Sequence, residues 1–168
     1  ARFSPIMQEV MEFAAKGGYV LGVCNGFQIL CESQLLPGAL LHNFSHKFIC
    51  KNIFIKAETD ETILTSSLKI GAAIKIPIAH GEGRFFADEA TLNQIESNNQ
   101  VLFRYCDENG YVTEAANTNG ALNNIAGICN EKRNVFGMMP HPERAADPLL
   151  GNTDGLGIFK SILNYVDA

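Results

Sequence analysis

Cys24 has the setting most suggestive of chemistry in this sequence. It follows the apolar run Tyr19–Val23, precedes an apolar-periodic segment, and lies in the spacing Gly22-x-Cys24-x-Gly26. Small residues around a nucleophile let a strand turn sharply into a helix, which lifts the side chain above the sheet edge. The N–H groups of Asn25 and Gly26 and the helix dipole would then favour a thiolate and later an oxyanion. A cysteine packed in the core fits the motif alone equally well.

A thiol nucleophile needs a base, and His141 has the best setting among the four histidines. The segment "MMPHPER" places it directly after an apolar run, at the carboxyl edge of the sheet where Cys24 is also expected. Pro142 should keep the backbone extended, so that Glu143 points to the same side and fixes the imidazole tautomer. The sequence therefore predicts Cys24, His141 and Glu143 as nucleophile, base and orienting carboxylate. A solvated polar loop is the alternative for "HPER".

The other histidines fall in two loop-like segments. His42 and His46 in "LHNFSHKF" have a spacing that could bind a metal on a helix, but the polar residues between them indicate a loop. We therefore predict no metal site there, and expect this loop at the edge of a substrate site. His80 and Glu82 lie in the glycine-containing "IAHGEGRF", where an ordinary turn and a role behind the site or at an interface are equally compatible.

Helices and short buried strands alternate near both ends of the chain. Periodicity and turn signals predict helices from Pro5 to Gly17, from Phe27 to Leu35, over 88–95 and from about Asp154, and strands over 19–23, 48–57, 74–79, 101–106, 125–129 and 135–139. This alternation implies parallel pairing at the ends, with a mixed or antiparallel middle. We predict one α/β domain over residues 1–168, a three-layer sandwich with a mostly parallel central sheet, similar to flavodoxin.

Composition bounds the class of protein. The 168 residues are 46% hydrophobic and 18% charged, which suits a single stable core. A net charge of -5 without a basic cluster argues against nucleic-acid binding. No apolar stretch is long enough to span a membrane and no export leader is recognised, so we expect a cytoplasmic location. The five cysteines are odd in number and widely spaced, which favours reduced thiols.

The segments "GVCNGFQIL" and "PHPER" resemble the signature of the class I glutamine amidotransferases, G-x-C-x-G-x-Q with a distant H-x-E. Gln28 completes the first half of this signature. The longer strings "GYVLGVCNGFQILCE", "IAHGEGRF", "MMPHPER" and "DGLGIF" resemble the glutaminase subunits of phosphoribosylformylglycinamidine synthases. The resemblance runs from about Arg2 to the final helix.

The resemblance implies a glutaminase that works through a glutamyl thioester in purine biosynthesis. Cys24 would attack the side-chain amide of L-glutamine, His141 would protonate the departing ammonia and Glu143 would hold His141. Ammonia would pass to a large synthase subunit, possibly with a small accessory subunit, which uses ATP and Mg; no cofactor is expected in this chain. The residues expected to contact the substrate are Asn25, whose N–H would stabilise the oxyanion, and Gln28, Phe44 and Ser45.

One departure from the family concerns the start of the chain. Family members begin with another strand, a helix and a glycine-rich loop that supplies a second oxyanion donor, and none of these is found before Ala1. We expect that further residues precede Ala1 in the natural protein. A catalytically impaired regulatory subunit is one alternative, which the intact Cys24, His141 and Glu143 disfavour. The glutaminase component of a different amidotransferase is another, which "IAHGEGRF" disfavours.

Overall fold

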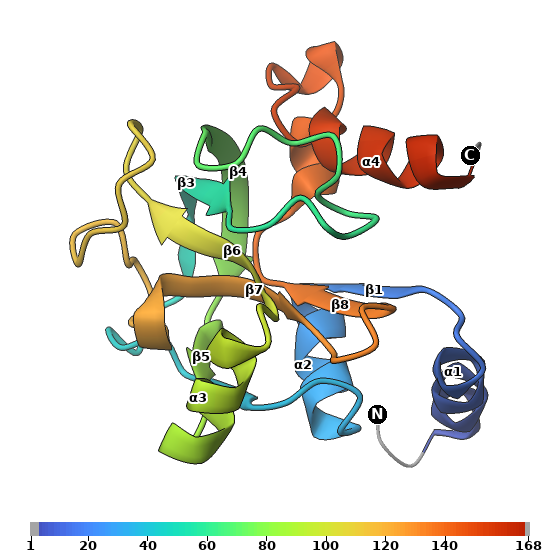
Figure 1. Ribbon diagram of the computed structural model, residues 1–168. Coiled ribbons are helices and arrows are strands. Elements are labelled where there is room, and N and C mark those ends of the chain that lie inside the picture. Colours follow the sequence, from blue (N-terminus) through green and yellow to red (C-terminus); the bar gives the residue numbers. More distant parts are fainter. Residues whose placement is uncertain (1–3, 167–168) are drawn as a thin grey trace.

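The fold is built around a six-stranded sheet, with a separate two-stranded sheet beside it (Figure 1). The computed structural model describes residues 4–166. Its elements are α1 (Pro5–Ala15), β1 (Val20–Val23), α2 (Asn25–Glu32), β2 (Ala39–Leu41), β3 (Ile49–Ala57), β4 (Ala73–His80), β5 (Arg84–Phe86), α3 (Glu89–Ser97), β6 (Val101–Cys106), η1 (Leu122–Asn124), β7 (Ile125–Cys129), β8 (Val135–Met138), η2 (Pro142–Ala145), η3 (Pro148–Leu150) and α4 (Leu156–Val166).

The six strands lie in the order β1-β8-β7-β6-β3-β4. Strands β1 and β8 pair in parallel, with Val23 opposite Met138, so the predicted parallel pairing of the two chain ends is confirmed. The other ladders of this sheet are antiparallel. The predicted mostly parallel sheet is therefore confirmed only in part. Strands that follow one another without a crossover helix, such as β7 and β8, pair antiparallel because a short connection reverses the chain.

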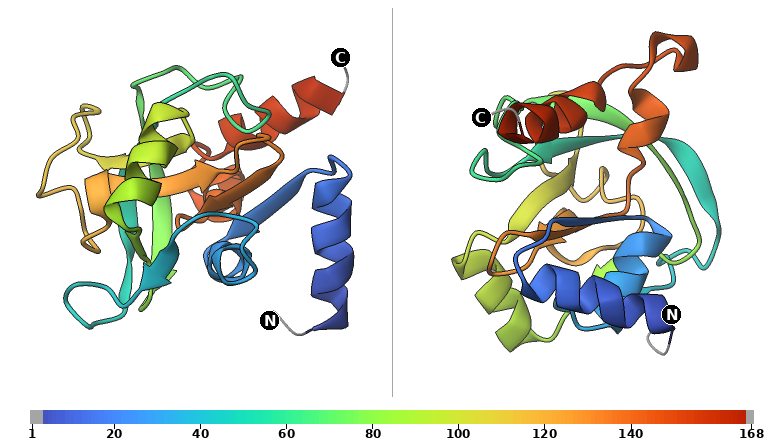
Figure 2. Two further views of the ribbon diagram at one scale, coloured as in Figure 1. Left: turned by 60° about the horizontal axis from the view of Figure 1, so that its bottom comes forward. Right: turned by 90° about the vertical axis from the view of Figure 1, so that its right-hand side faces the viewer.

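Helices cover both faces of the sheet, which confirms the three-layer arrangement. In both Figure 1 and the right-hand view of Figure 2, α2 and α3 lie on one side of the strands and α4 lies on the other. Helix α2 is seated by Phe27, which is fully buried and stacks on Phe85 with 6.1 Å between ring centroids. A Cβ at Gly137 of β8 would overlap the Phe27 ring. The glycine thus lets the helix pack directly on the strand that leads to His141.

Two features of the fold differ from the sequence prediction. The helix predicted from Phe27 to Leu35 begins earlier, at Asn25, and ends earlier, at Glu32. Strands β2 and β5 were not predicted, because three residues are too few to display an alternating pattern.

Within residues 4–166, none of the helices has the length and apolar character needed to cross a membrane.

The sheet curls so that β4 reaches the loops that follow β1 and β8. The carbonyl oxygen of Pro77 accepts the backbone N–H of His141 at 2.9 Å, and that of Ala79 accepts the thiol of Cys24 at 3.8 Å. Strand β4 ends the sheet on the side opposite β1, so these contacts join its two edges. Proline suits an edge strand because it has no N–H to leave unpaired. The edge of β4 therefore becomes a wall of the site.

Candidate active site

Cys24 lies on the sharp turn that the sequence predicts. It joins the end of β1 to the start of α2 with φ 52° and ψ −106°, a strained conformation for a residue with a side chain. Such strain costs about 1–3 kcal/mol and persists only where the surroundings impose it. A Cβ at Gly22 would lie 2.6 Å from the carbonyl carbon of Gly26, so Gly22 permits this close approach. A Cβ at Gly26 would meet nothing within 4 Å, so only the first glycine is required for space.

The charge state of Cys24 differs from the prediction of a thiolate. Burial raises the pKa of the thiol above its ordinary value, and this effect exceeds the opposing effects of the Asn25 N–H and the Arg144 guanidinium. The contact with the Ala79 carbonyl, at 3.8 Å, also suits a sulfur that carries its hydrogen, since a carbonyl oxygen only accepts. The surroundings of Cys24 in the resting site therefore favour the thiol over the thiolate.

His141 and Glu143 form the predicted pair. Nδ1 of His141 lies 2.6 Å from Oε1 of Glu143. Because an ionised carboxylate only accepts hydrogen bonds, Nδ1 carries the hydrogen and Nε2 is left with the lone pair that a general base needs. The predicted extended backbone is wrong: Pro142 begins the short helix η2 and His141 caps it. Proline is compatible with a helix start because its missing N–H would be unpaired there.

The fold brings Cys24 and His141 to one place without a hydrogen bond between them. The N–H of Cys24 donates to the carbonyl of Met138 at 2.8 Å, three residues before His141, and both residues are attached to the edge of β4. Yet Nε2 of His141 is buried and has no hydrogen-bond partner among residues 4–166. Catalytic hydrogen bonds often form only once the substrate is bound. The fold therefore brings the two residues into one region, and no hydrogen bond joins their side chains in the resting site.

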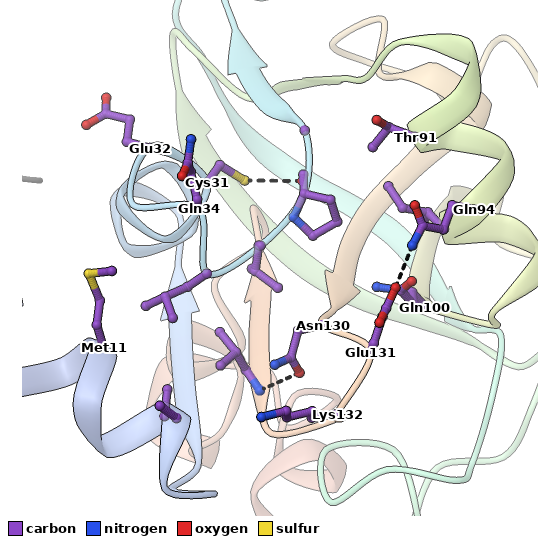
Figure 3. A pocket seen from close by; sticks show the side chains of 18 residues that line it. Met11, Cys31, Glu32, Gln34, Thr91, Gln94, Gln100, Asn130, Glu131 and Lys132 are labelled. Atoms are coloured by element: carbon purple, nitrogen blue, oxygen red, sulfur yellow. Dashed lines mark hydrogen bonds between the residues drawn. The ribbon is translucent and has the colours of Figure 1, made fainter.

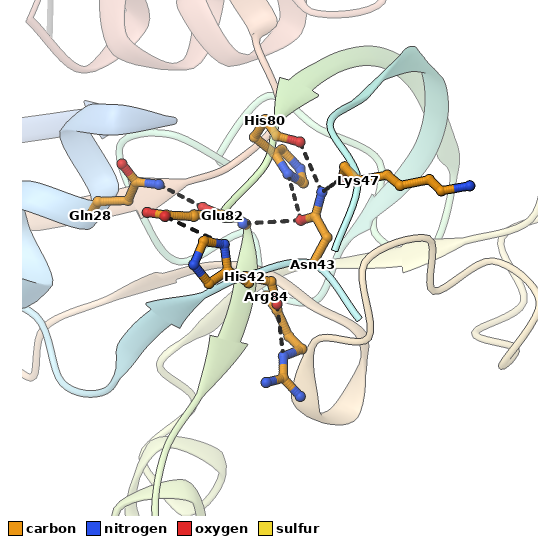
Figure 4. Close-up of polar contacts among 8 residues, drawn as sticks. Gln28, His42, Asn43, Lys47, His80, Glu82 and Arg84 are labelled. Atoms are coloured by element: carbon orange, nitrogen blue, oxygen red, sulfur yellow. Dashed lines mark hydrogen bonds and ion pairs between the residues drawn. The ribbon is translucent and has the colours of Figure 1, made fainter. Parts of the chain in front are cut away.

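Asn25 and Gln28 lie in the first turn of α2, next to Cys24. Nδ2 of Asn25 donates to Oε1 of Gln28 at 3.1 Å. Nε2 of Gln28 in turn donates to the carbonyl of Glu82 at 2.6 Å (Figure 4). Gln28 thus connects the helix that carries the nucleophile to the turn after β4. Both predicted substrate residues are placed at the site.

Phe44 and Ser45 lie on the exposed loop between β2 and β3. The side chain of Phe44 is 78% exposed, and its N–H donates to the carbonyl of Asn119 at 2.9 Å. The hydroxyl of Ser45 accepts the N–H of Lys47 at 3.4 Å. The residue before them, Asn43, is fully buried and connects this loop to β4. The structure therefore places both predicted residues on an exposed loop that is joined to β4 through Asn43.

The sequence does not decide the role of His80, and the structure shows that its side chain is buried. Its side chain is 3% exposed, and Nδ1 lies 3.0 Å from Oδ1 of Asn43 (Figure 4). Burial, together with a smaller effect of the nearby His141, lowers the pKa of His80 to about 4. A sequence signal existed: in "IPIAH" every second residue, Ile76, Ile78 and His80, faces inward along β4.

His42 and His46 lie in a loop, as predicted. The rings of His42 and His46 have centroids 6.0 Å apart, and Nδ1 of His42 lies 3.4 Å from a carboxylate oxygen of Glu82. Across the part of the chain that the structure describes, no group of three or more histidine, cysteine, aspartate or glutamate side chains is arranged to hold a metal ion.

Comparison with known sequences gives close relatives. A model of the CobB/CobQ-like glutamine amidotransferase domain matches residues 1–165. The phosphoribosylformylglycinamidine synthase subunit PurQ of Trichormus variabilis is 56% identical over 168 residues, which are 100% of this chain and 71% of that protein. The PurQ subunit of Salinibacter ruber is 54% identical over 166 residues, covering 99% of this chain and 71% of that protein.

Comparison with solved structures gives the same fold. The structure of PurLQS from Thermotoga maritima matches with a TM-score of 0.84 and 42% identity, over 98% of this chain and 70% of that chain. A glutamine amidotransferase from the same organism matches with a TM-score of 0.52 at 18% identity, over 83% of this chain and 46% of that chain. This more distant likeness supports the fold alone.

Proposed function

The chain belongs to the family of CobB/CobQ-like glutamine amidotransferase domains, and from this premise we infer that it is the glutaminase subunit of a phosphoribosylformylglycinamidine synthase in purine biosynthesis. Its partner is the synthase subunit, and its substrate is L-glutamine. Two observations together carry the proposal. Cys24 lies on a strained strand-to-helix turn after β1, and the hydrogen-bonded pair of His141 and Glu143 follows the adjacent parallel strand β8.

Cys24 is the nucleophile of the proposed reaction. Its sulfur attacks the amide carbon of the glutamine side chain once His141 Nε2 has taken the thiol proton, which raises the nucleophilicity of the sulfur. The N–H of Asn25 points toward the sulfur and stabilises the negative charge that develops on the amide oxygen. Glu143 accepts from Nδ1 of His141 and stabilises the imidazolium that forms.

The imidazolium then completes the release of ammonia. His141 gives its proton to the amide nitrogen, the C–N bond breaks, and a glutamyl thioester remains on Cys24. Water then attacks the thioester with His141 as the base, and glutamate leaves with regeneration of the thiol. Because the Cys24 thiol donates to Ala79 in the resting site, this sequence begins only when the thiol turns from that carbonyl to Nε2 of His141.

The proposal assigns the later chemistry to the partner. Ammonia passes to the synthase subunit, which uses ATP and Mg to convert an amide into an amidine, while this chain binds no cofactor. We place the protein in the cytoplasm, where thiols stay reduced, because all five cysteines are free. Asn25 and Gln28 contact the glutamine, and the loop with Phe44 and Ser45 borders the opening through which it enters.

Covalent labelling tests this function directly. The subunit assembled with its synthase partner is incubated with a diazo ketone analogue of glutamine, and the modified peptide is identified by mass spectrometry. We expect one adduct, on Cys24, whose formation is slowed by added glutamine. The Cys31→Ala variant serves as the matched control, because the Cys31 side chain is buried in the core and its removal should not affect labelling. If Cys24 stays unmodified in the loaded complex, the glutaminase proposal fails.

A further inference from the structure

The hydrogen bonds of Asn43 determine which nitrogen of His80 carries the hydrogen. The two hydrogens of its Nδ2 are taken by the carbonyls of Lys47 and His80, each at 2.8 Å. Its Oδ1 accepts the N–H of Gly83 at 3.2 Å, which fixes the orientation of the amide. Figure 4 shows these contacts converging on Asn43 from both sides. The atom that faces Nδ1 of His80 at 3.0 Å is therefore an oxygen that can only accept.

Nδ1 of His80 must consequently be the donor, and Nε2 carries a bare lone pair. This second nitrogen is buried and lacks a hydrogen-bond partner among residues 4–166. A buried acceptor without a partner destabilises the folded protein, and native proteins rarely retain one without a reason. The ring is also held tightly: a Cβ on Gly83 would overlap it.

His80 lies at the end of β4, the strand that contacts both Cys24 and His141. The preceding residue, Ala79, holds the Cys24 thiol with its carbonyl oxygen. His141 is close enough to His80 to disfavour its protonation, and its own Nε2 is likewise buried without a partner in the described chain. Two imidazole nitrogens without a partner in the described chain are thus found where β4 contacts the turn at Cys24 and the segment of His141, and only that of His141 has a role in the steps above.

We propose that Nε2 of His80 accepts a hydrogen bond from an N–H of the glutamine side-chain amide and holds that nitrogen while it departs as ammonia. This inference rests on the proposed glutaminase function. In the step it serves, the sulfur of Cys24 forms a bond to the amide carbon, the C–N bond breaks, and His141 supplies the proton that the nitrogen gains. His80 stays neutral throughout, because it accepts a hydrogen bond and takes no proton.

The proposal makes His80 a selector for amides. An amide nitrogen brings hydrogens to the lone pair of Nε2, whereas the leaving oxygen of an ester brings only lone pairs of its own. The γ-methyl ester of glutamate therefore gains nothing from His80, although its acylation forms the same thioester on Cys24. A site that leaves a buried acceptor unpaired discriminates strongly against the ligand that cannot satisfy it.

Two substitutions separate the roles of the two ring nitrogens. In His80→Asn the side-chain amide takes the place of Nδ1, so the bond to Asn43 is kept and the acceptor is lost. In His80→Gln the longer side chain places its oxygen near Nε2, so the acceptor is kept and the bond to Asn43 is lost. A merely structural His80 would be replaced better by asparagine, and an acceptor for substrate would be replaced better by glutamine.

The measurement is kcat/KM for glutamine and for the γ-methyl ester, in the complex with the synthase partner. We expect His80→Asn to lower kcat/KM for glutamine about ten- to a hundredfold and to leave the ester within about threefold. His80→Gln should retain the preference for the amide even if both values fall. Gln94→Asn, a change of side-chain length on the exposed face of α3, should leave the amide to ester ratio unchanged.

An unchanged amide to ester ratio in His80→Asn would overturn the proposal, as would His80→Gln losing the amide preference. If the asparagine variant fails to assemble, the ratio in His80→Gln decides alone. Failure of the glutaminase function looks different, because the unmodified complex would then hydrolyse neither substrate through Cys24.

Discussion

The two ends of α2 place a cysteine in opposite environments. Cys24 precedes the first turn with a positive φ, is partly exposed, and lies within reach of the charges of Arg144 and Glu143. Cys31 lies in the last turn and is 7% exposed. Burial raises the pKa of Cys31 to about 12. The same side chain is thus a candidate nucleophile at one end of the helix and a small apolar group at the other.

A large cavity lies at the end of α2 that carries Cys31. This cavity of about 700 Å³ is lined by α1, α2 and α3, with Cys31, Glu32 and Gln34 on one wall and Gln94 and Gln100 on another (Figure 3). Its lining does not include Cys24, His141 or Glu143. Volume alone would therefore select the wrong end of the helix. The reactivity of a thiol depends on its position relative to a strand end and a base. The volume of a nearby cavity gives no information about that position.

The largest expected effect comes from removing the sulfur at each end. Cys24→Ala should abolish glutamine-dependent synthesis, because no other group can form the thioester, while the assembled enzyme still uses added ammonium salt. Cys31→Ala should keep both activities and lower the free energy of unfolding by about 1 kcal/mol through lost packing. Steady-state rates with each nitrogen source and denaturant unfolding provide the two measurements.

Equal losses of glutamine-dependent activity in both variants would remove the distinction between the two ends of the helix. Glutamine-dependent turnover that persists in Cys24→Ala would show that the nucleophile is a different residue. The ammonium-dependent rate is the internal control for folding and assembly, since it requires the intact complex and bypasses the thiol.

A smaller but sharper difference should appear in the reaction of the two thiols with iodoacetamide. Only the thiolate reacts, and its fraction rises about tenfold per pH unit until the pKa is reached. Because burial raises the pKa of the Cys24 thiol above its ordinary value, its alkylation rate should climb throughout pH 7–9 without a plateau. Cys31 should stay unmodified in the folded protein.

Peptide mass spectrometry follows each cysteine separately, and the exposed Cys50 reports the reactivity of the reagent. A plateau for Cys24 near pH 7 would mean that the Asn25 N–H and the Arg144 charge outweigh burial in the resting site. That outcome would restore the thiolate that the sequence predicts and would contradict the resting contact with Ala79.

The sequence predicted those parts of the site that depend on local pattern. The turn at Cys24 was predicted from glycine spacing, and the position of His141 at the same sheet edge follows from two buried strands pairing in parallel. The pairing of His141 with Glu143 was predicted for the wrong backbone reason, because two residues on a short helix can meet as well as two on an extended segment.

The remaining parts depend on contacts between distant segments. Nothing in the alternation of β4 indicates that the sheet curls until Ala79 meets Cys24, since antiparallel partners are chosen by packing across the whole core. His80 was missed as a buried group because "HGEG" carries turn signals directly after it. The thiolate was predicted from the helix terminus alone, whereas the extent of burial is a property of the assembled fold.

The smallest effect concerns the two glycines beside Cys24. A Cβ at Gly22 would lie 2.6 Å from backbone and Leu30 side-chain atoms, so Gly22→Ala should push α2 away from β1 and lower the free energy of unfolding by about 1–3 kcal/mol. A Cβ at Gly26 meets nothing within 4 Å, so Gly26→Ala, within the helix, should leave stability unchanged or raise it by up to about 1 kcal/mol. Urea unfolding of the two variants gives the comparison directly. If Gly26→Ala proves the more destabilising change, the strain at Cys24 is held by the helix start and not by the strand, and the positive φ of the nucleophile needs a different explanation.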